Sequence, residues 1–193
     1  MSIRNTEAGW GWLARLIHWS SGLVILYMLG LGVYMTQFVS DIYEQFAWTQ
    51  VHKSWGFVAF VLALARIGWR FVNPTPELPG EMTALERLGA RLGHLALYGL
   101  VIAMPVTGWL MSTASTLQDS YGIKNMVFGL FEMPDPFVPG SSVLEEIFSR
   151  AHTASAIALG LLVAGHIAVA LRHQFVKRDG LLRRMIVGPE ETA

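Results

Sequence analysis

Six histidines occur in this chain, and four of them lie inside long apolar runs: His18, His52, His152 and His166. The imidazole ring is both a common metal ligand and a proton carrier. Ionisable side chains are costly inside a bilayer, and where they occur they usually mark a functional site. The chemistry of this chain therefore depends on where the four histidines lie relative to one another and to a membrane.

The composition is that of a membrane protein. Hydrophobic residues make up 53% of the 193 residues and charged residues only 15%, whereas soluble domains carry about 25% charged residues. The length favours one compact unit, so we expect a single domain over residues 1–193. The absence of cysteine excludes disulfides, thiolate chemistry and cysteine-ligated metal sites. The formal net charge is zero, so the overall charge gives no sign of a nucleic-acid partner.

Four apolar runs reach the roughly 20 residues that are needed to cross a bilayer. Because backbone polar groups in lipid must be satisfied within the segment, each run is expected to be a helix. The runs cover residues 16–37, 51–72, 92–113 and 151–172. The sequence therefore predicts an all-α integral membrane protein, built as a four-helix bundle in contact with lipid. We also expect a separate short interfacial helix at 144–148, before the last span.

Four spans place both ends of the chain on the same side of the membrane. Side A then carries the N-terminal segment, residues 73–91 and the C-terminal tail, and side B carries residues 38–50 and 114–150. Of the fourteen Lys and Arg residues, eleven lie on or near side A and three on or near side B. Cytoplasmic segments are enriched in Lys and Arg, so we expect side A, with both termini, to be cytoplasmic.

The direction of each span sorts the four histidines by depth. His18 lies near side A, whereas His52 and His152 begin their spans near side B. His166 follows His152 by 14 residues, which is about 21 Å along a helix and almost four whole turns, so the two share one face. The histidines therefore form two layers, with His18 and His166 near side A and His52 and His152 near side B.

Each layer combines one histidine from each of two helices. This is the arrangement in which two imidazoles clamp a planar iron porphyrin, and helix bundles hold such cofactors in their cores. Gly22 and Gly56 follow His18 and His52 by one turn, and the missing side chains leave clearance for the edge of a porphyrin ring. The sequence therefore predicts two haems, ligated by the two histidine pairs.

Two other interpretations of these histidines remain open. Any one of them can be a packing or proton-transfer residue, and the protein would then be a non-redox membrane bundle. A zinc or di-iron site is the other option, but zinc prefers three or four ligands close together and carboxylates usually complete a di-iron site. No acidic residue lies within any of the four runs, so two haems account better for the pattern.

Two further histidines lie near side A. His94 begins the third run and competes with His18 as the partner of His166; we favour His18 as the ligand and His94 as a polar packing residue. His173 follows His166 by seven residues, on the same face and about 10 Å nearer side A. It is either an interfacial histidine or a hydrogen-bond donor or proton carrier for a quinone headgroup.

Five basic residues flank the two layers. Arg15, Arg66 and Arg70 lie near side A, where they either anchor helix ends or pair with haem propionates, since Arg binds carboxylates in bidentate geometry. Lys53 and Arg150 flank the layer near side B, on an otherwise acidic face. Together they can attract a small anion, although Lys53 alone is equally compatible with a side chain that snorkels to the membrane surface.

Several sequence motifs carry a resemblance to a known family. They are WLARLIHWSSGLVI, His52 followed by Gly56, ARIGWRFVNPTP, LGHLALYGLVIAMPVTGW and AHTASAIALGLLVAGHIAVALRHQFVKRDGLLRRM. Through them the chain resembles the prokaryotic cytochrome b561 family over nearly its whole length, with segment 114–150 matching least. The resemblance implies a protein of the bacterial inner membrane that binds two b-type haems and passes electrons between a periplasmic donor and the quinone pool.

Within that family the chain looks like a superoxide:ubiquinone oxidoreductase. The resemblance then implies oxidation of periplasmic superoxide, or of another one-electron donor, and reduction of ubiquinone. It places the haem ligands at His18, His52, His152 and His166 and the quinone-side histidine at His173. The alternative of the same redox class is the haem-b membrane subunit of a larger dehydrogenase, such as a hydrogenase or formate dehydrogenase, whose protein partner docks on segment 114–150.

Overall fold

The computed structural model describes residues 2–7, 9–80 and 82–188. Within these residues four long helices dominate: α1 (Trp12–Gln37), α2 (Ile42–Phe71), α3 (Ala84–Thr113) and α5 (Ser142–Arg172). Each is long and apolar enough to cross a membrane. The prediction of an all-α bundle of four membrane helices is confirmed.

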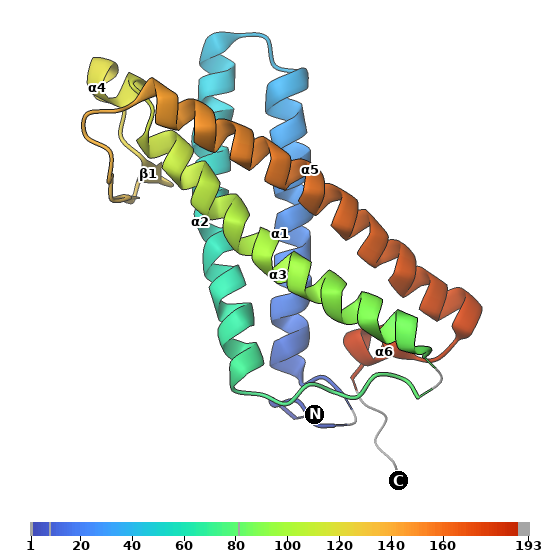
Figure 1. Cartoon of the computed structure of the whole chain (residues 1–193). Helices are drawn as coiled ribbons and strands as arrows, with labels where there is room; N and C mark the ends of the chain where they lie inside the picture. The colour runs from blue at the N-terminus through green and yellow to red at the C-terminus, as the bar shows by residue number, and fades with distance from the viewer. Residues whose placement is uncertain (1, 8, 81, 189–193) are drawn as a thin grey trace.

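The four helices form two antiparallel pairs. Helix α1 packs against α2 and α3 packs against α5, while α2 and α3 join the two pairs. Figure 1 shows the α3–α5 pair crossing the α1–α2 pair at a marked angle. The beginning of α1 and the last described residues lie at the same end of the bundle, where the Arg15 guanidinium donates a hydrogen bond of 2.8 Å to the carbonyl of Ile186.

Three of the membrane helices begin well before their apolar runs, because polar caps satisfy their first backbone N–H groups. The Asp41 carboxylate caps α2, and Thr83 and Glu86 form a reciprocal capping box at the start of α3. The Ser141 hydroxyl caps α5. Segment 144–148 is therefore the first part of α5, and the prediction of a separate interfacial helix there is wrong.

The long connection at side B has local structure that the hydropathy pattern does not predict. It contains the short helix α4 (Leu117–Tyr121) and an antiparallel hairpin of β1 (Met126–Val127) and β2 (Phe131–Glu132). The turn of the hairpin uses left-handed backbone at Phe128 (φ 49°) and Gly129 (φ 71°). The Phe128 N–H donates a 2.9 Å hydrogen bond to the Ser54 hydroxyl, which fastens the hairpin to α2.

At side A the last span ends in a change of helix type. The π-helix η1 (His173–Lys177) follows α5, and its end is closed by a 2.7 Å bond from the Arg178 N–H to the His173 carbonyl. Left-handed backbone at Arg178 and Gly180 then turns the chain into helix α6 (Leu181–Ile186). This reversal brings α6 back beneath the bundle, where the Trp19 indole N–H donates to the Met185 carbonyl at 2.9 Å.

Candidate functional site

A cavity of about 2330 Å³ lies between the two helix pairs. Its walls include five of the six histidines, namely His18, His52, His94, His152 and His166. Sites for one small organic ligand usually occupy about 300–1,000 Å³. The cavity therefore has room for more than one large planar group, and it reaches both histidine layers.

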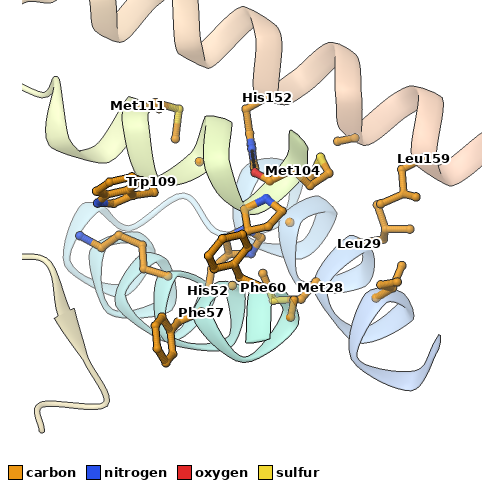
Figure 2. A pocket seen from close by; sticks show the side chains of 18 of the residues that line it. Met28, Leu29, His52, Phe57, Phe60, Met104, Trp109, Met111, His152 and Leu159 are labelled. Carbon is orange, nitrogen blue, oxygen red and sulfur yellow. Dashed lines mark hydrogen bonds between the residues drawn. The ribbon is translucent and has the colours of Figure 1, made fainter. Parts of the chain in front are cut away.

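The histidine pair near side B faces the cavity from two helices. The ring centroids of His52 in α2 and His152 in α5 are 6.3 Å apart (Figure 2). A metal lies about 2.0–2.1 Å from an imidazole nitrogen, so two opposed rings that share one metal have centroids roughly 6 Å apart. The spacing of this pair matches the requirement for a shared metal.

The orientation of the His152 ring is determined by α3. Its Nδ1 lies 3.1 Å from the carbonyl oxygen of Met104 and 3.2 Å from the hydroxyl of Thr107. Because a carbonyl only accepts, Nδ1 carries the proton and Nε2 keeps its lone pair. Metal-binding histidines are usually held in this way, with the second ring nitrogen donating to a carbonyl or carboxylate.

A glycine that the sequence analysis did not single out makes room for this ring. A Cβ atom at Gly108 would lie 3.0 Å from Cε1 and 3.2 Å from Nδ1 of His152. Any side chain there would push the imidazole away from α3 or rotate it. No local sequence signal marks Gly108, because its role depends on how closely α5 approaches α3.

The layer near side A contains three imidazoles. The His166 ring centroid lies 6.2 Å from that of His18 and 5.8 Å from that of His94. Both His18 and His94 therefore lie close enough to His166 to share a metal with it, and ring spacing alone does not decide which of them is its partner.

The donor set fits paired haem ligands better than a zinc or di-iron centre. In the described part of the chain, no group of three or more His, Cys, Asp or Glu side chains is arranged to hold a metal ion. The Nδ1 atoms of His18 and His52 are buried and have no hydrogen-bond partner among the described residues. Buried polar atoms of this kind commonly mark the place of a missing ligand or water.

The two glycines predicted to give clearance both line the cavity. A Cβ atom at Gly22 would meet nothing within 4 Å, and one at Gly56 would meet only the end of the Met28 side chain at 3.7 Å. Both positions therefore border open space beside the histidine layers, as a bulky planar ligand requires.

Of the three arginines near side A, only Arg66 lines the cavity. Its guanidinium carbon lies 5.7 Å from the centroid of the Tyr98 ring. Arg15 instead turns toward α6 through its bond to the Ile186 carbonyl, and Arg70 does not border the cavity. The geometry thus favours Arg66 over the other two as a partner for an anionic group in the cavity.

The two basic residues predicted at side B are separated by the structure. Lys53 lines the cavity and donates hydrogen bonds to Asn125 Oδ1 at 3.0 Å and to the Ser112 hydroxyl at 3.3 Å. Arg150 is exposed and forms a 2.6 Å ion pair with Glu146 one turn earlier in α5. The two cations therefore do not act on the cavity together.

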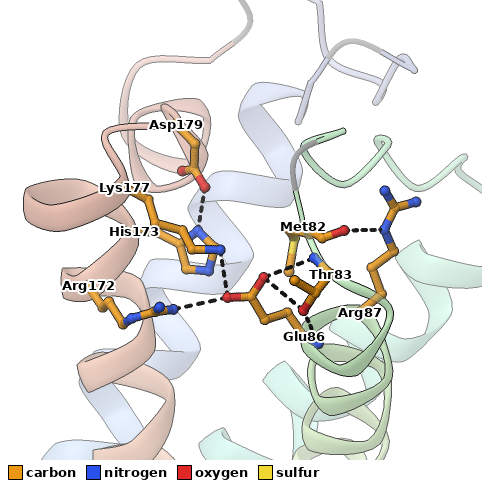
Figure 3. A network of polar contacts seen from close by, with 8 residues as sticks. All are labelled: Met82, Thr83, Glu86, Arg87, Arg172, His173, Lys177 and Asp179. Carbon is orange, nitrogen blue, oxygen red and sulfur yellow. Dashed lines mark hydrogen bonds and ion pairs between the residues drawn. The ribbon is translucent and has the colours of Figure 1, made fainter.

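His173 follows the last span and does not line the cavity. Its side chain is 1% exposed, and its Nδ1 donates to the Asp179 carboxylate (Figure 3). Asp179 also accepts the Leu181 N–H at 3.1 Å. Burial acts to raise the pKa of Asp179, but the hydrogen bonds from His173 and Leu181 outweigh it, so this pKa lies below its ordinary value. Neither sequence interpretation of His173 included a carboxylate partner.

A second ionic cluster joins α3 to η1 beside this pair. One carboxylate oxygen of Glu86 forms ion pairs with Lys177 at 2.6 Å and with Arg172 at 3.1 Å (Figure 3). The cluster ties the beginning of α3 to the end of the last span. It therefore holds the segment that carries His173 in place.

Comparison with known proteins places the chain in a family. The family described as prokaryotic cytochrome b561 matches residues 9–188. The chain is 31% identical over 189 residues to "Cytochrome b561 homolog 2" of Escherichia coli (strain K12), covering 96% of this chain and 95% of that protein. It is 26% identical over 137 residues to "Cytochrome b561 homolog 1" of the same organism, covering 71% and 73%. Together with its four membrane helices, this similarity makes the chain a multi-pass protein of the bacterial inner membrane. The chain belongs to the prokaryotic cytochrome b561 family.

Proposed function

We propose that this protein transfers electrons across the inner membrane through two b-type haems, from superoxide at side B to ubiquinone at side A. Membership of the cytochrome b561 family supports haem-b electron transfer in the membrane as the general activity. The observation that carries the two-haem assignment is the presence of two histidine layers in one cavity, with ring spacings of 6.3 Å for His52/His152 and 6.2 Å for His18/His166, where we propose His18 rather than His94 as the ligand.

The two sites would lie in series along one cavity. His152 and His166 belong to the same helix and are about 21 Å apart along its axis. The charge bias of the sequence assigns side B to the periplasm and side A to the cytoplasm. An electron that enters at the His52/His152 pair and leaves at the His18/His166 pair therefore crosses most of the membrane.

The histidines of each pair hold and orient the cofactor. When bound, haem b supplies a reversible one-electron couple. The two imidazoles of each pair would hold the haem between them, and the haem would then supply outer-sphere electron transfer rather than oxygen activation. The Met104 carbonyl fixes the tautomer of His152, and Met28 and Phe60 contribute to the apolar wall that excludes water (Figure 2).

The overall reaction balances with two donor molecules for each quinone. Two superoxide anions lose one electron each and become dioxygen, and one ubiquinone takes these two electrons with two protons and becomes ubiquinol. Reduction of the quinone therefore needs a proton-holding group at side A. The buried His173, hydrogen-bonded to Asp179 and seven residues beyond His166, is the group that we assign to this role.

One observation favours the alternative function, a haem-b subunit docked to a larger dehydrogenase. The side B connection exposes large apolar side chains, with Leu130 at 80% and Val138 at 74%. Apolar side chains on a loop outside the spans can mark a contact with a protein partner. Purification from mild detergent distinguishes the two functions, since a dehydrogenase subunit would copurify with a large partner.

The test of the proposed function uses the purified full-length protein. An absorption spectrum should show b-type haem that is reduced by dithionite, with a ratio of two haems to one chain. With superoxide as the only donor, the protein should then reduce ubiquinone-1. A protein that lacks haem is a non-redox bundle, and a haem protein that is inert to superoxide rejects the proposed donor.

A further inference from the structure

Three polar side chains from different parts of the chain meet on the cavity wall near side B. Lys53 comes from α2, Ser112 from the end of α3, and Asn125 from the residue before β1; all three line the cavity. The Lys53 ammonium donates to Asn125 Oδ1 at 3.0 Å and to the Ser112 hydroxyl at 3.3 Å. The Ser112 hydroxyl donates to the same Asn125 oxygen at 2.5 Å.

These contacts determine which way the Asn125 amide faces. An ammonium group only donates, so the atom that it approaches is the amide oxygen and the NH₂ group points away from it. That NH₂ group is buried and has no hydrogen-bond partner among the described residues, and Asn125 is only 5% exposed. A buried donor without a partner is destabilising unless a ligand or water accepts its hydrogen bonds.

The positive charge of Lys53 also lacks a counter-charge. No carboxylate in the described part of the chain lies within 4.0 Å of its ammonium nitrogen. Glu146, which also lines the cavity, pairs with Arg150 instead. Charges removed from water are normally paired, so a half-buried ammonium beside a buried NH₂ group favours a negatively charged acceptor.

The position of Asn125 is set by the hairpin that follows it. The Met133 N–H donates to the Asn125 carbonyl at 2.8 Å, and the Phe128 N–H donates to the Ser54 hydroxyl of α2 at 2.9 Å. The rings of Phe128 and Trp55 also pack edge to face, with centroids 5.8 Å apart. The hairpin thus holds Asn125 against α2, where its anchors Ser54 and Trp55 directly follow Lys53.

We propose that Lys53 and Asn125 form an anion-binding site that takes a carboxylate or a small oxyanion at the side B end of the cavity. Lys53 directly follows His52, so the bound anion lies beside the His52/His152 pair. One source of this chemistry is a propionate of the haem at that pair, and this part of the inference rests on the proposed function. The other source is a small free anion that enters from side B.

The test compares three variants of the full-length protein. Asn125→Leu removes the amide donors at similar volume, and Lys53→Met removes the ammonium from a different element. Lys124→Gln is the matched control, since Lys124 is the neighbouring lysine and is exposed in an ion pair with Glu132. Size-exclusion chromatography and circular dichroism identify any variant that does not fold, and either site variant alone suffices for the test.

The first measurement is the midpoint potential and retention of each haem. If a propionate occupies the site, Asn125→Leu and Lys53→Met lower the potential of one haem only, because an uncompensated carboxylate favours the oxidised iron. Transfer of that haem to apomyoglobin becomes about tenfold faster, as expected for loss of a hydrogen bond to a charged group. The Lys124→Gln protein should match the wild type in both measurements.

The second measurement is the Kd for formate, a small carboxylate, determined by calorimetric titration. If a free anion occupies the site, the potentials of the charge-neutral Asn125→Leu variant stay unchanged and the Kd for formate rises about tenfold or more in the two site variants. The inference is overturned, and the proposed function is left intact, by one outcome. The wild-type protein contains two haems, but both site variants match Lys124→Gln in midpoint potential, haem retention and formate binding. Wild-type protein without haem would reject the proposed function, and formate binding would still test the site.

Discussion

His152 of α5 donates its Nδ1 proton to the carbonyl oxygen of Met104 in α3, at a distance of 3.1 Å. One helix thus determines the tautomer of a histidine that belongs to another, and the free Nε2 is available to the cavity. His152 faces His52 at 6.3 Å in this orientation. The side B site therefore depends on three helices, two that carry the imidazoles and one that orients them.

Replacement of His152 by Gln should remove one haem and spare the other. The expected result is a fall from two haems per chain to one, because the remaining His18/His166 pair lies at the other end of the cavity. The haem-to-protein ratio and the reduced spectrum measure this directly. His52→Gln should lose the same haem, and an additive loss of both haems in the double variant would contradict the pairing.

The choice between His18 and His94 can be decided in the same way. Both rings lie near His166, at 6.2 and 5.8 Å, and we expect His18→Gln to lose the side A haem while His94→Gln keeps it. Electron paramagnetic resonance of the remaining haem checks that its ligands are unchanged. The reverse pattern would move the ligand from α1 to α3.

Gly108→Ala should weaken the side B site selectively. Its new Cβ would lie 3.0 Å from Cε1 of His152, so the ring must move away from its hydrogen bond to Met104. We expect about tenfold faster loss of one haem to apomyoglobin, equivalent to the loss of about one hydrogen bond. Gly99→Ala is the control in the same helix, since its Cβ would meet nothing within 4 Å. Equal behaviour of the two variants would argue against a role for Gly108.

Asp179→Asn should lower stability at neutral pH but not in acid. The pKa of Asp179 is lower in the folded protein than its ordinary value of 3.8, so the ionised carboxylate stabilises the fold above that pH. The stabilisation is lost as the pH falls through the folded-state pKa. The thermal midpoint of the variant in detergent should be roughly 3–10 °C lower at pH 7, and the difference should begin to shrink below about pH 3.8 and vanish below the folded-state pKa. Glu146→Gln, which breaks an exposed pair, should change little at either pH.

The spans and the depth of each histidine follow from the sequence alone. Hydropathy defines a membrane helix because the bilayer has a fixed thickness, and the constant rise of a helix converts residue number into depth. These two regularities are independent of the neighbouring helices. They therefore predicted the four-helix architecture and placed His18 with His166 and His52 with His152, and the structure brings the rings of both pairs together.

The sequence did not predict which helices contact one another or where polar caps begin the helices. The caps at Thr83 and Ser141 extend helices past their apolar runs, which hydropathy does not register, and so segment 144–148 was misassigned. The approach of α5 to α3 gives Gly108 and Met104 their roles. The contact of Asn125 with Lys53 joins residues that are 72 positions apart in the sequence, and the hairpin holds Asn125 in place for it.

The tertiary structure also separated residues that the sequence grouped. Arg15 turns to α6 and Arg150 to Glu146, whereas Arg66 and Lys53 border the cavity. Depth in the membrane is a property of one helix and can be counted along the chain. Which side chains meet at a given depth depends on the rotation and crossing of several helices and on the loops that return between them, and only the folded chain determines these.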